Sequence, residues 1–228
     1  MTLPFRFALA LATLTLLLPG CKSADRVMFQ PSPAALTERL PSLEIAVENG
    51  PLDTSAGALP DDPQRLFERE VRMNLSDPED TLRFGTAQLQ VVDCSTKRTG
   101  RVLQGLQMLT FMLPSLLGVP LEWYETDLKA AVQIVSAQGD TLATYTGRGQ
   151  SRVRVAVYHG YSQTQAHRVA DLAALREALA QIKLQLDNDS GRLRGALLTA
   201  GPLRRGSGQS TGSLPVPAAD AQARTAAR

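Results

Sequence analysis

Five aliphatic residues recur at spacings of three and four in the second half of the chain: Leu172, Leu175, Leu179, Ile182 and Leu186. At 3.6 residues per turn, this spacing places all five side chains on one face of a helix and marks that face as buried. The sequence predicts that the helix is capped at its start by Asp171 and closed by Asn188-Asp189-Ser190-Gly191.

Alternation of apolar and polar residues predicts five β-strands. They cover residues 43–47, 86–93, 130–135, 141–146 and 153–157. Gln138-Gly139-Asp140 has the character of a hairpin turn between the third and the fourth strand. Gly147 and Gly149 indicate a bulge or bend between the fourth and the fifth.

A second helix is predicted before the second strand. Asp61-Asp62-Pro63 provides an acidic N-cap with a proline in the first turn, and Ser76-Asp77-Pro78 ends the helix. Its apolar stripe consists of Leu66, Phe67, Val71 and Leu75. The order is strand, helix, strand, apolar segment, three strands and helix. This order predicts a single α+β domain with a mixed or mainly antiparallel sheet covered by helices.

Residues 1–20 have the pattern of a signal peptide. Arg6 and the amino terminus supply positive charge, and an uncharged, mainly apolar run from Phe7 to Leu18 follows. This run is shorter than the about 20 apolar residues that a membrane-spanning helix needs. We therefore interpret it as an export signal.

The run ends in Leu18-Pro19-Gly20-Cys21. These four residues resemble the lipobox of bacterial lipoproteins: an aliphatic residue, a variable residue, a small residue and then cysteine. The resemblance implies cleavage before Cys21 and lipidation of its thiol. Lys22-Ser23 follow in place of the aspartate that favours retention in the inner membrane, which implies the outer membrane, facing the periplasm. The inner membrane stays the alternative.

The composition divides the mature chain into three parts. Residues 21–41, with three prolines among polar residues, are expected to form a lipidated tether that holds the body off the bilayer. Residues 42–200 contain all the predicted strands and helices and form the globular domain. Residues 201–228, rich in Gly, Ser, Pro, Ala, Gln and Arg, are expected to form a disordered tail.

No charged residue lies between Arg101 and Glu122. Three interpretations compete for Val102–Leu121: a buried helix from Val102 to Leu113 that is broken by Pro114, an interfacial element that dips into lipid, and a transmembrane helix. Its prolines, glycines and glutamines argue against the transmembrane helix, and the buried helix is our first choice. In the interfacial case three aromatic side chains contact the membrane: Phe111, Trp123 and Tyr124.

The sequence contains few residues that suggest catalysis. His159 and His167 are the only histidines, and their surroundings lack the four-ligand spacing of a zinc site, so we expect no metal or other cofactor. A hydrolase that uses Ser162 with a histidine, and Asp171 beside His167, is an alternative, although no nucleophile-elbow motif surrounds Ser162. We instead interpret three residues as a partner-contact loop: Tyr158, His159 and Tyr161.

Cys94 has no cysteine to pair with once Cys21 is acylated, so we expect it to behave as a small apolar residue. The formal net charge of +2 gives no electrostatic reason to expect nucleic-acid binding. The sequence therefore predicts a lipid-anchored, non-enzymatic envelope lipoprotein that serves as an accessory or docking component for an envelope protein. The alternative is a carrier or sensor of apolar ligands that uses Val102–Leu121.

Overall fold

The computed structural model describes residues 28–57, 59–100, 120, 122–156 and 161–203. These residues form one four-stranded sheet whose strand order follows the chain. Its strands are β1 (Glu44–Glu48), β2 (Gly85–Thr99), β3 (Glu122–Ser136) and β4 (Thr141–Val155). β1 is parallel to β2, and the other two pairs are antiparallel. The predicted mixed sheet is confirmed.

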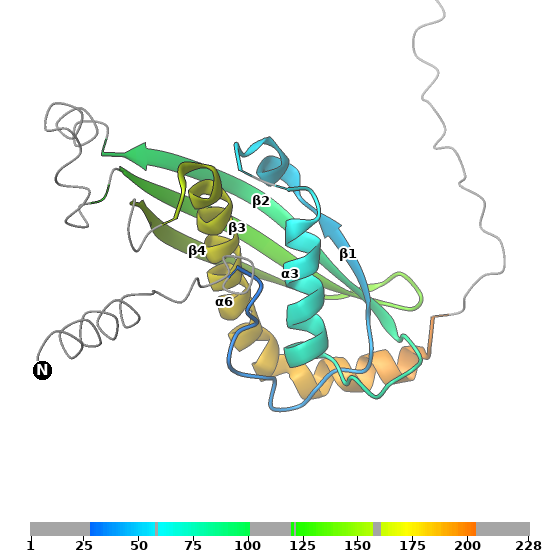
Figure 1. The fold of residues 1–228 in the computed structure, drawn as a ribbon. Coiled ribbons are helices and arrows are strands. Elements are labelled where there is room, and N and C mark those ends of the chain that lie inside the picture. Colours follow the sequence, from blue (N-terminus) through cyan, green and yellow to red (C-terminus); the bar gives the residue numbers. More distant parts are fainter. Residues whose placement is uncertain (1–27, 58, 101–119, 121, 157–160, 204–228) are drawn as a thin grey trace, which may run out of the picture.

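Two helices, α3 (Asp62–Glu70) and α6 (Gln163–Ala200), lie on the same face of this sheet (Figure 1). A 3-10 turn, η1 (Gly50–Thr54), follows β1, and a π-helical turn, η2 (Val71–Leu75), continues α3. One sheet with helices on one side is the α+β architecture that the sequence predicts.

Because side chains alternate along a strand, the two faces of the sheet differ in character. In β3 the even-numbered residues from Glu122 to Ser136 are buried beneath the helices, whereas charged residues such as Asp127 point to the opposite face. In β2 a bulge between Val91 and Asp93 shifts the alternation by one residue. As a result, Cys94 and not Asp93 is on the helix side.

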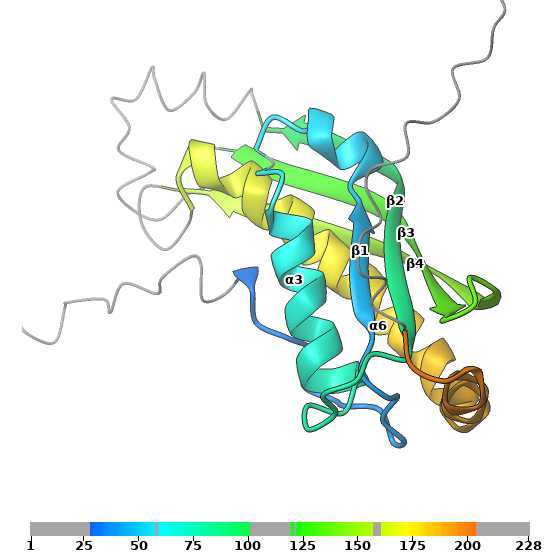
Figure 2. The same ribbon diagram turned by 90° about the vertical axis from the view of Figure 1, so that its right-hand side faces the viewer.

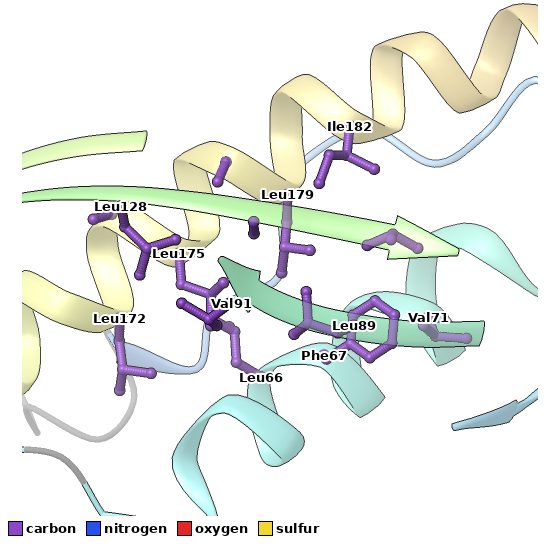
Figure 3. Packing of buried hydrophobic residues seen from close by; sticks show 14 of the residues in the cluster. Leu66, Phe67, Val71, Leu89, Val91, Leu128, Leu172, Leu175, Leu179 and Ile182 are labelled. Atoms are coloured by element: carbon purple, nitrogen blue, oxygen red, sulfur yellow. The ribbon is translucent and has the colours of Figure 1, made fainter. Parts of the chain in front are cut away.

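The predicted apolar stripe of α6 is confirmed, since its five residues are at most 4% exposed. In Figure 3, Leu175 and Leu179 of this stripe lie close to Leu66 of α3 and to Leu89 and Val91 of β2. The stripe predicted for α3 is buried as well. Each fully buried leucine of this kind contributes about 1.5–3 kcal/mol to burial free energy. The two stripes and the sheet therefore form one shared core.

α3 and η2 together begin and end where the sequence predicts one helix, but the acidic start of α3 has another role. Asp61 occupies the N-cap position without a side-chain cap hydrogen bond. Asp62 is buried and accepts two hydrogen bonds from Arg168 of α6, at 2.5 and 2.8 Å. The interpretation of this acidic pair as a helix cap is therefore wrong for Asp62, which joins the two helices.

α6 extends beyond both of its predicted ends. It begins after Ser162, so Asp171 lies inside the helix and does not cap it. Asn188-Asp189-Ser190-Gly191 stays helical because Leu193 and Leu197 continue the apolar stripe and are fully buried. The helix ends at Gly201, whose φ of 79° is readily adopted by glycine. With 38 residues at 1.5 Å each, α6 is about 57 Å long.

The fourth and fifth predicted strands are a single strand, β4, which pairs with β3 through Gly147 and Gly149. The predicted bulge or bend at these glycines is therefore wrong. A β-carbon on Gly149 would lie 1.8 Å from the carbonyl oxygen of Ala174, and one on Gly147 would lie 2.3 Å from that of Ala178. The two glycines thus allow the backbone of α6 to rest directly on the strand.

Side chains of α6 also cover the free edge of β4. They make three hydrogen bonds with the strand backbone: Arg148 N–H to Gln181 at 3.1 Å, Gln150 N–H to Glu177 at 2.9 Å, and Gln185 to the Thr146 carbonyl at 2.8 Å. A long edge strand with unpaired backbone groups is a template for unwanted strand pairing. The helix therefore protects this edge from within the same chain.

Residues 28–41 pack on the helical layer beside α3 (Figure 2). Met28, Leu36 and Leu40 are at most 5% exposed, and the N–H of Leu40 donates to the carbonyl of Leu75 at 2.9 Å. The tether predicted for residues 21–41 therefore does not extend to residue 41. The folded body begins at or before Met28, which shortens the predicted tether to a few residues.

Candidate functional site

The structure describes some of the predicted site residues and not others. Four lie outside the described ranges: Cys21, Phe111, Tyr158 and His159. The Val102–Leu121 segment lies outside them as well, apart from Pro120. Tyr161 of the predicted partner-contact loop is described. It is half-buried against the core and forms an isolated bridge with Val155.

Tyr124 and Trp123 point to opposite faces of β3. Tyr124 is 3% exposed, and its ring centroid lies 3.8 Å from that of His167 on α6, so its ring faces the core and not a membrane. Its hydroxyl donates to Glu122 at 3.1 Å, and burial together with this carboxylate raises the pKa of Tyr124. Trp123 is half-buried on the outer face, where the guanidinium of Arg152 lies 5.2 Å from its ring centroid.

The groups suggested for a hydrolase do not come together within the described residues. His167 Nδ1 is buried and has no hydrogen-bond partner there. Ser162 is the N-cap residue of α6, and its hydroxyl lies 3.1 Å from that of Thr164. Asp171, the suggested acid, binds hydroxyl groups on other elements. This part of the chain therefore contains no assembled Ser–His–Asp arrangement.

Asp171 is the centre of a buried polar cluster between α6 and the sheet. It is 2% exposed, and its carboxylate accepts hydrogen bonds from Thr126 at 2.9 Å, Thr96 at 3.2 Å and Ser55 at 2.5 Å. Burial, with a further contribution from the Asp171 charge, raises the pKa of the Cys94 thiol to about 11. A protonated thiol is a poor nucleophile, which agrees with the apolar role expected for Cys94.

A second buried cluster joins the N-terminal segment to both helices. Lys183 of α6 and Glu70 of α3 are 7% and 3% exposed and form an ion pair at 3.4 Å. Ser32 lies between them: its N–H donates to Glu70 at 2.9 Å, and its hydroxyl bonds both the Glu70 carboxylate and the Lys183 ammonium. Asn74 donates to the Ser32 carbonyl at 2.8 Å. We call these four residues the Ser32 clamp.

The contacts of the Ser32 clamp indicate a structural role and not a catalytic one. A serine beside a lysine also occurs in hydrolases, where a neutral amine accepts the serine proton. Here the Lys183 ammonium donates to Ser32, to the Ala34 carbonyl and to Glu70, so its three N–H groups are all engaged. Removing one partner of such a buried pair typically costs about 3–5 kcal/mol. The cluster therefore fixes the N-terminal segment on the body.

Arginines of α3, η2 and α6 gather beside the first described residues. A groove of about 620 Å³ is lined by Phe29, Glu68, Met73 and four arginines: Arg65, Arg69, Arg72 and Arg168. Arg69 donates to the carbonyl of Phe29 at 2.9 Å, and the Arg168 guanidinium lies 5.9 Å from the Phe29 ring centroid. Met73 is 54% exposed. We call this feature the Phe29 groove.

The face of the sheet opposite the helices carries charges that are paired across the strands. Arg148 of β4 makes two hydrogen bonds to Asp127 of β3, and Arg152 pairs with Glu125 at 3.1 Å. The Arg148 guanidinium lowers the pKa of Asp127. A shallow hollow of about 770 Å³ lies over these residues. Its charges of both signs largely compensate each other.

Within the described ranges, no group of three or more potential metal ligands occurs, and no helix is long and apolar enough to cross a membrane. No family model and no curated protein sequence matches this chain. Its function must therefore be inferred from its own sequence motif and contacts.

Proposed function

We propose that this chain is a bacterial lipoprotein, anchored through acylated Cys21 to the outer membrane and facing the periplasm. In this proposal it is not an enzyme but an accessory or docking component for an envelope protein. The lipobox-type sequence Leu18-Pro19-Gly20-Cys21, placed directly after the apolar run, carries the proposal. At about 0.8 kcal/mol per buried methylene, two or three acyl chains would hold the protein stably in the membrane.

The point at which the folded body begins is consistent with such an anchor. Met28 is buried, so seven peptide units separate Cys21 from the body. A fully extended chain of this length spans at most about 25 Å. The proposed acyl anchor would therefore hold the body next to the membrane surface.

The charged face of the sheet supports the docking role. Asp127, Arg148 and their neighbours form a broad, solvent-exposed surface with charges at fixed positions. Complementary charges across an interface select the correct partner and its register more than they add affinity. A folded envelope protein with a matching polar surface fits this face.

Cell fractionation of a Cys21→Ala variant tests the anchor. The variant is expected to leave the membrane fraction, whereas Cys94→Ala, which removes the other cysteine, is expected to stay there. Mass spectrometry of the mature N-terminal peptide should show acyl chains on Cys21. A bare N-terminal peptide, or a Cys21→Ala variant that stays in the membrane, would contradict the proposal.

Site-specific photo-crosslinking in cells tests the docking role. A crosslinking residue at Lys129, on the charged face of the sheet, is expected to capture one envelope protein reproducibly. The same residue at Leu184, which is 68% exposed on α6, is the control and is expected not to capture it. Equal capture at both positions, or no reproducible product at Lys129, would contradict docking through this face.

The uncharged run Val102–Leu121 favours a second candidate, a carrier or sensor of apolar ligands. This candidate predicts that lipid co-purifies with the protein after delipidating washes. It also predicts that replacing Phe111 with a charged residue removes that lipid without detaching the protein from the membrane.

A further inference from the structure

We propose that the Phe29 groove binds the phosphate headgroups of anionic phospholipids in the leaflet that holds the acyl chains of Cys21. This inference rests on the proposed lipidation. Beyond the lipidation, the inference states which face of the body meets the membrane and which lipid chemistry this face recognises.

The first step is the geometry of the anchor. Phe29 directly follows Met28, and it lines the groove. The groove therefore lies at the point where the chain from Cys21 joins the body, and Phe29 is within about 29 Å of the acylated residue. The length of α6 is about 57 Å, about twice that reach. The connection is thus too short to let the body turn freely, and it keeps the groove close to the lipid.

The second step is the chemistry of the groove. The planar guanidinium of arginine binds phosphate oxygens through two parallel hydrogen bonds. Asp62 already binds Arg168, and Asp61 lies 3.9 Å from Arg65. The positive excess of the groove therefore comes mainly from Arg69 and Arg72 against the single carboxylate of Glu68.

The groove also has an apolar component. Arg69 is held in place by its hydrogen bond to the Phe29 carbonyl, and the Arg168 guanidinium lies 5.9 Å from the centroid of the Phe29 ring. Met73, next to Arg72, is 54% exposed. An exposed apolar side chain such as Met73 beside basic residues suits the boundary between headgroups and acyl chains. The hollow on the charged sheet face differs, because its arginines are paired with carboxylates.

The experiment uses the acylated full-length protein in vesicles, with an environment-sensitive fluorophore on Met73→Cys in a Cys94→Ala background. Vesicles contain phosphatidylcholine alone or with about 30% phosphatidylglycerol. We expect a blue shift only with the anionic lipid, and we expect about 0.5 M NaCl to reverse it by screening. Two arginines near an anionic surface each favour docking about five-fold. The Arg69→Gln/Arg72→Gln variant, which removes both arginines that supply the positive excess, should therefore lower the ratio of docked to undocked protein about 25-fold.

The matched control is Arg152→Gln/Arg192→Gln, which removes two arginines of similar exposure from other faces and should leave the blue shift unchanged. An equal loss in this control would show a net-charge effect and overturn the assignment to the groove. Acylated, vesicle-bound protein whose fluorescence is the same in both lipids would overturn the inference while the proposed function stands. Protein that carries no acyl chain and does not float with vesicles would overturn both.

Discussion

Replacing Gly149 with alanine tests whether close contact between α6 and β4 is essential to this fold. The added β-carbon would lie 1.8 Å from the carbonyl oxygen of Ala174 and 2.8 Å from the backbone nitrogen of Ala178. A carbon–oxygen contact is normally about 3.3 Å or longer. The helix would therefore have to move away from the strand by about 1.5 Å, because its backbone has no rotamer that could relieve the clash.

This displacement costs free energy in two ways. Overpacking of a well-packed contact costs about 1–3 kcal/mol. The hydrogen bonds from Gln150 N–H to Glu177 and from Arg148 N–H to Gln181 would be stretched, and each contributes about 0.5–1.5 kcal/mol. We therefore expect Gly149→Ala to lower the free energy of unfolding by about 2–6 kcal/mol, out of a typical total of about 5–15 kcal/mol.

Urea unfolding followed by circular dichroism, on the chain from Lys22 onward, measures this loss. Gly195→Ala is the matched control, because no atom lies within 4 Å of the β-carbon it would add. Because Gly195 lies on the exposed side of α6 and alanine has a higher helix propensity than glycine, this change should raise the free energy of unfolding by about 0.5–1 kcal/mol. If Gly149→Ala changed that free energy by less than about 1 kcal/mol, the argument that this contact requires glycine would be refuted.

The buried polar groups give three more predictions. Lys183→Met should lower the free energy of unfolding, measured in urea, by about 3–5 kcal/mol because it leaves the buried Glu70 carboxylate uncompensated. The double variant Lys183→Met/Glu70→Gln should lose less. An equal loss in the two variants would contradict the pairing of Lys183 with Glu70. Since burial raises the Cys94 pKa to about 11, iodoacetamide at pH 8 should alkylate this thiol much more slowly in the folded protein than in protein unfolded in urea. Equal rates in the two states would contradict the burial of Cys94. Burial, and then the hydrogen bond to Asp189, raise the Tyr145 pKa to about 12. Folding therefore favours the protonated phenol, and stability should fall as the pH rises from about 10 to 12, less steeply in Tyr145→Phe.

Local patterns predicted the elements, and tertiary contacts decided where they end. The stripes of α3 and α6 could be read from the sequence because burial on one helix face repeats at a fixed spacing. That β4 is a single strand could not be read from the sequence. Gly147 and Gly149 interrupt the apolar pattern in the same way whether they form a bulge or make room for a helix. Only the position of Ala174 on the opposite element distinguishes the two cases.

The Ser32 clamp was detectable in part. Lys183 lies four residues after Leu179 and three before Leu186, so its position alone places a charge on the buried face of α6. Glu70, three residues after Phe67, does the same on α3. Opposite charges on the buried faces of two helices predict a pair, since an unpaired buried charge is too costly.

Ser32 itself gave no such signal, because its proline neighbours suggest an extended linker. Its role depends on where α3 and α6 bring their two charges, and that is a property of the assembled fold.

The position of Ser32 also has a consequence for the proposed function. A chain fixed at Ser32, eleven residues after Cys21, does not behave as a flexible tether, because Met28 to Ser32 are already part of the body. Loosening the clamp with Lys183→Met should therefore lengthen the free connection to the acyl anchor and weaken the orientation of the Phe29 groove, even though every arginine of the groove is still present.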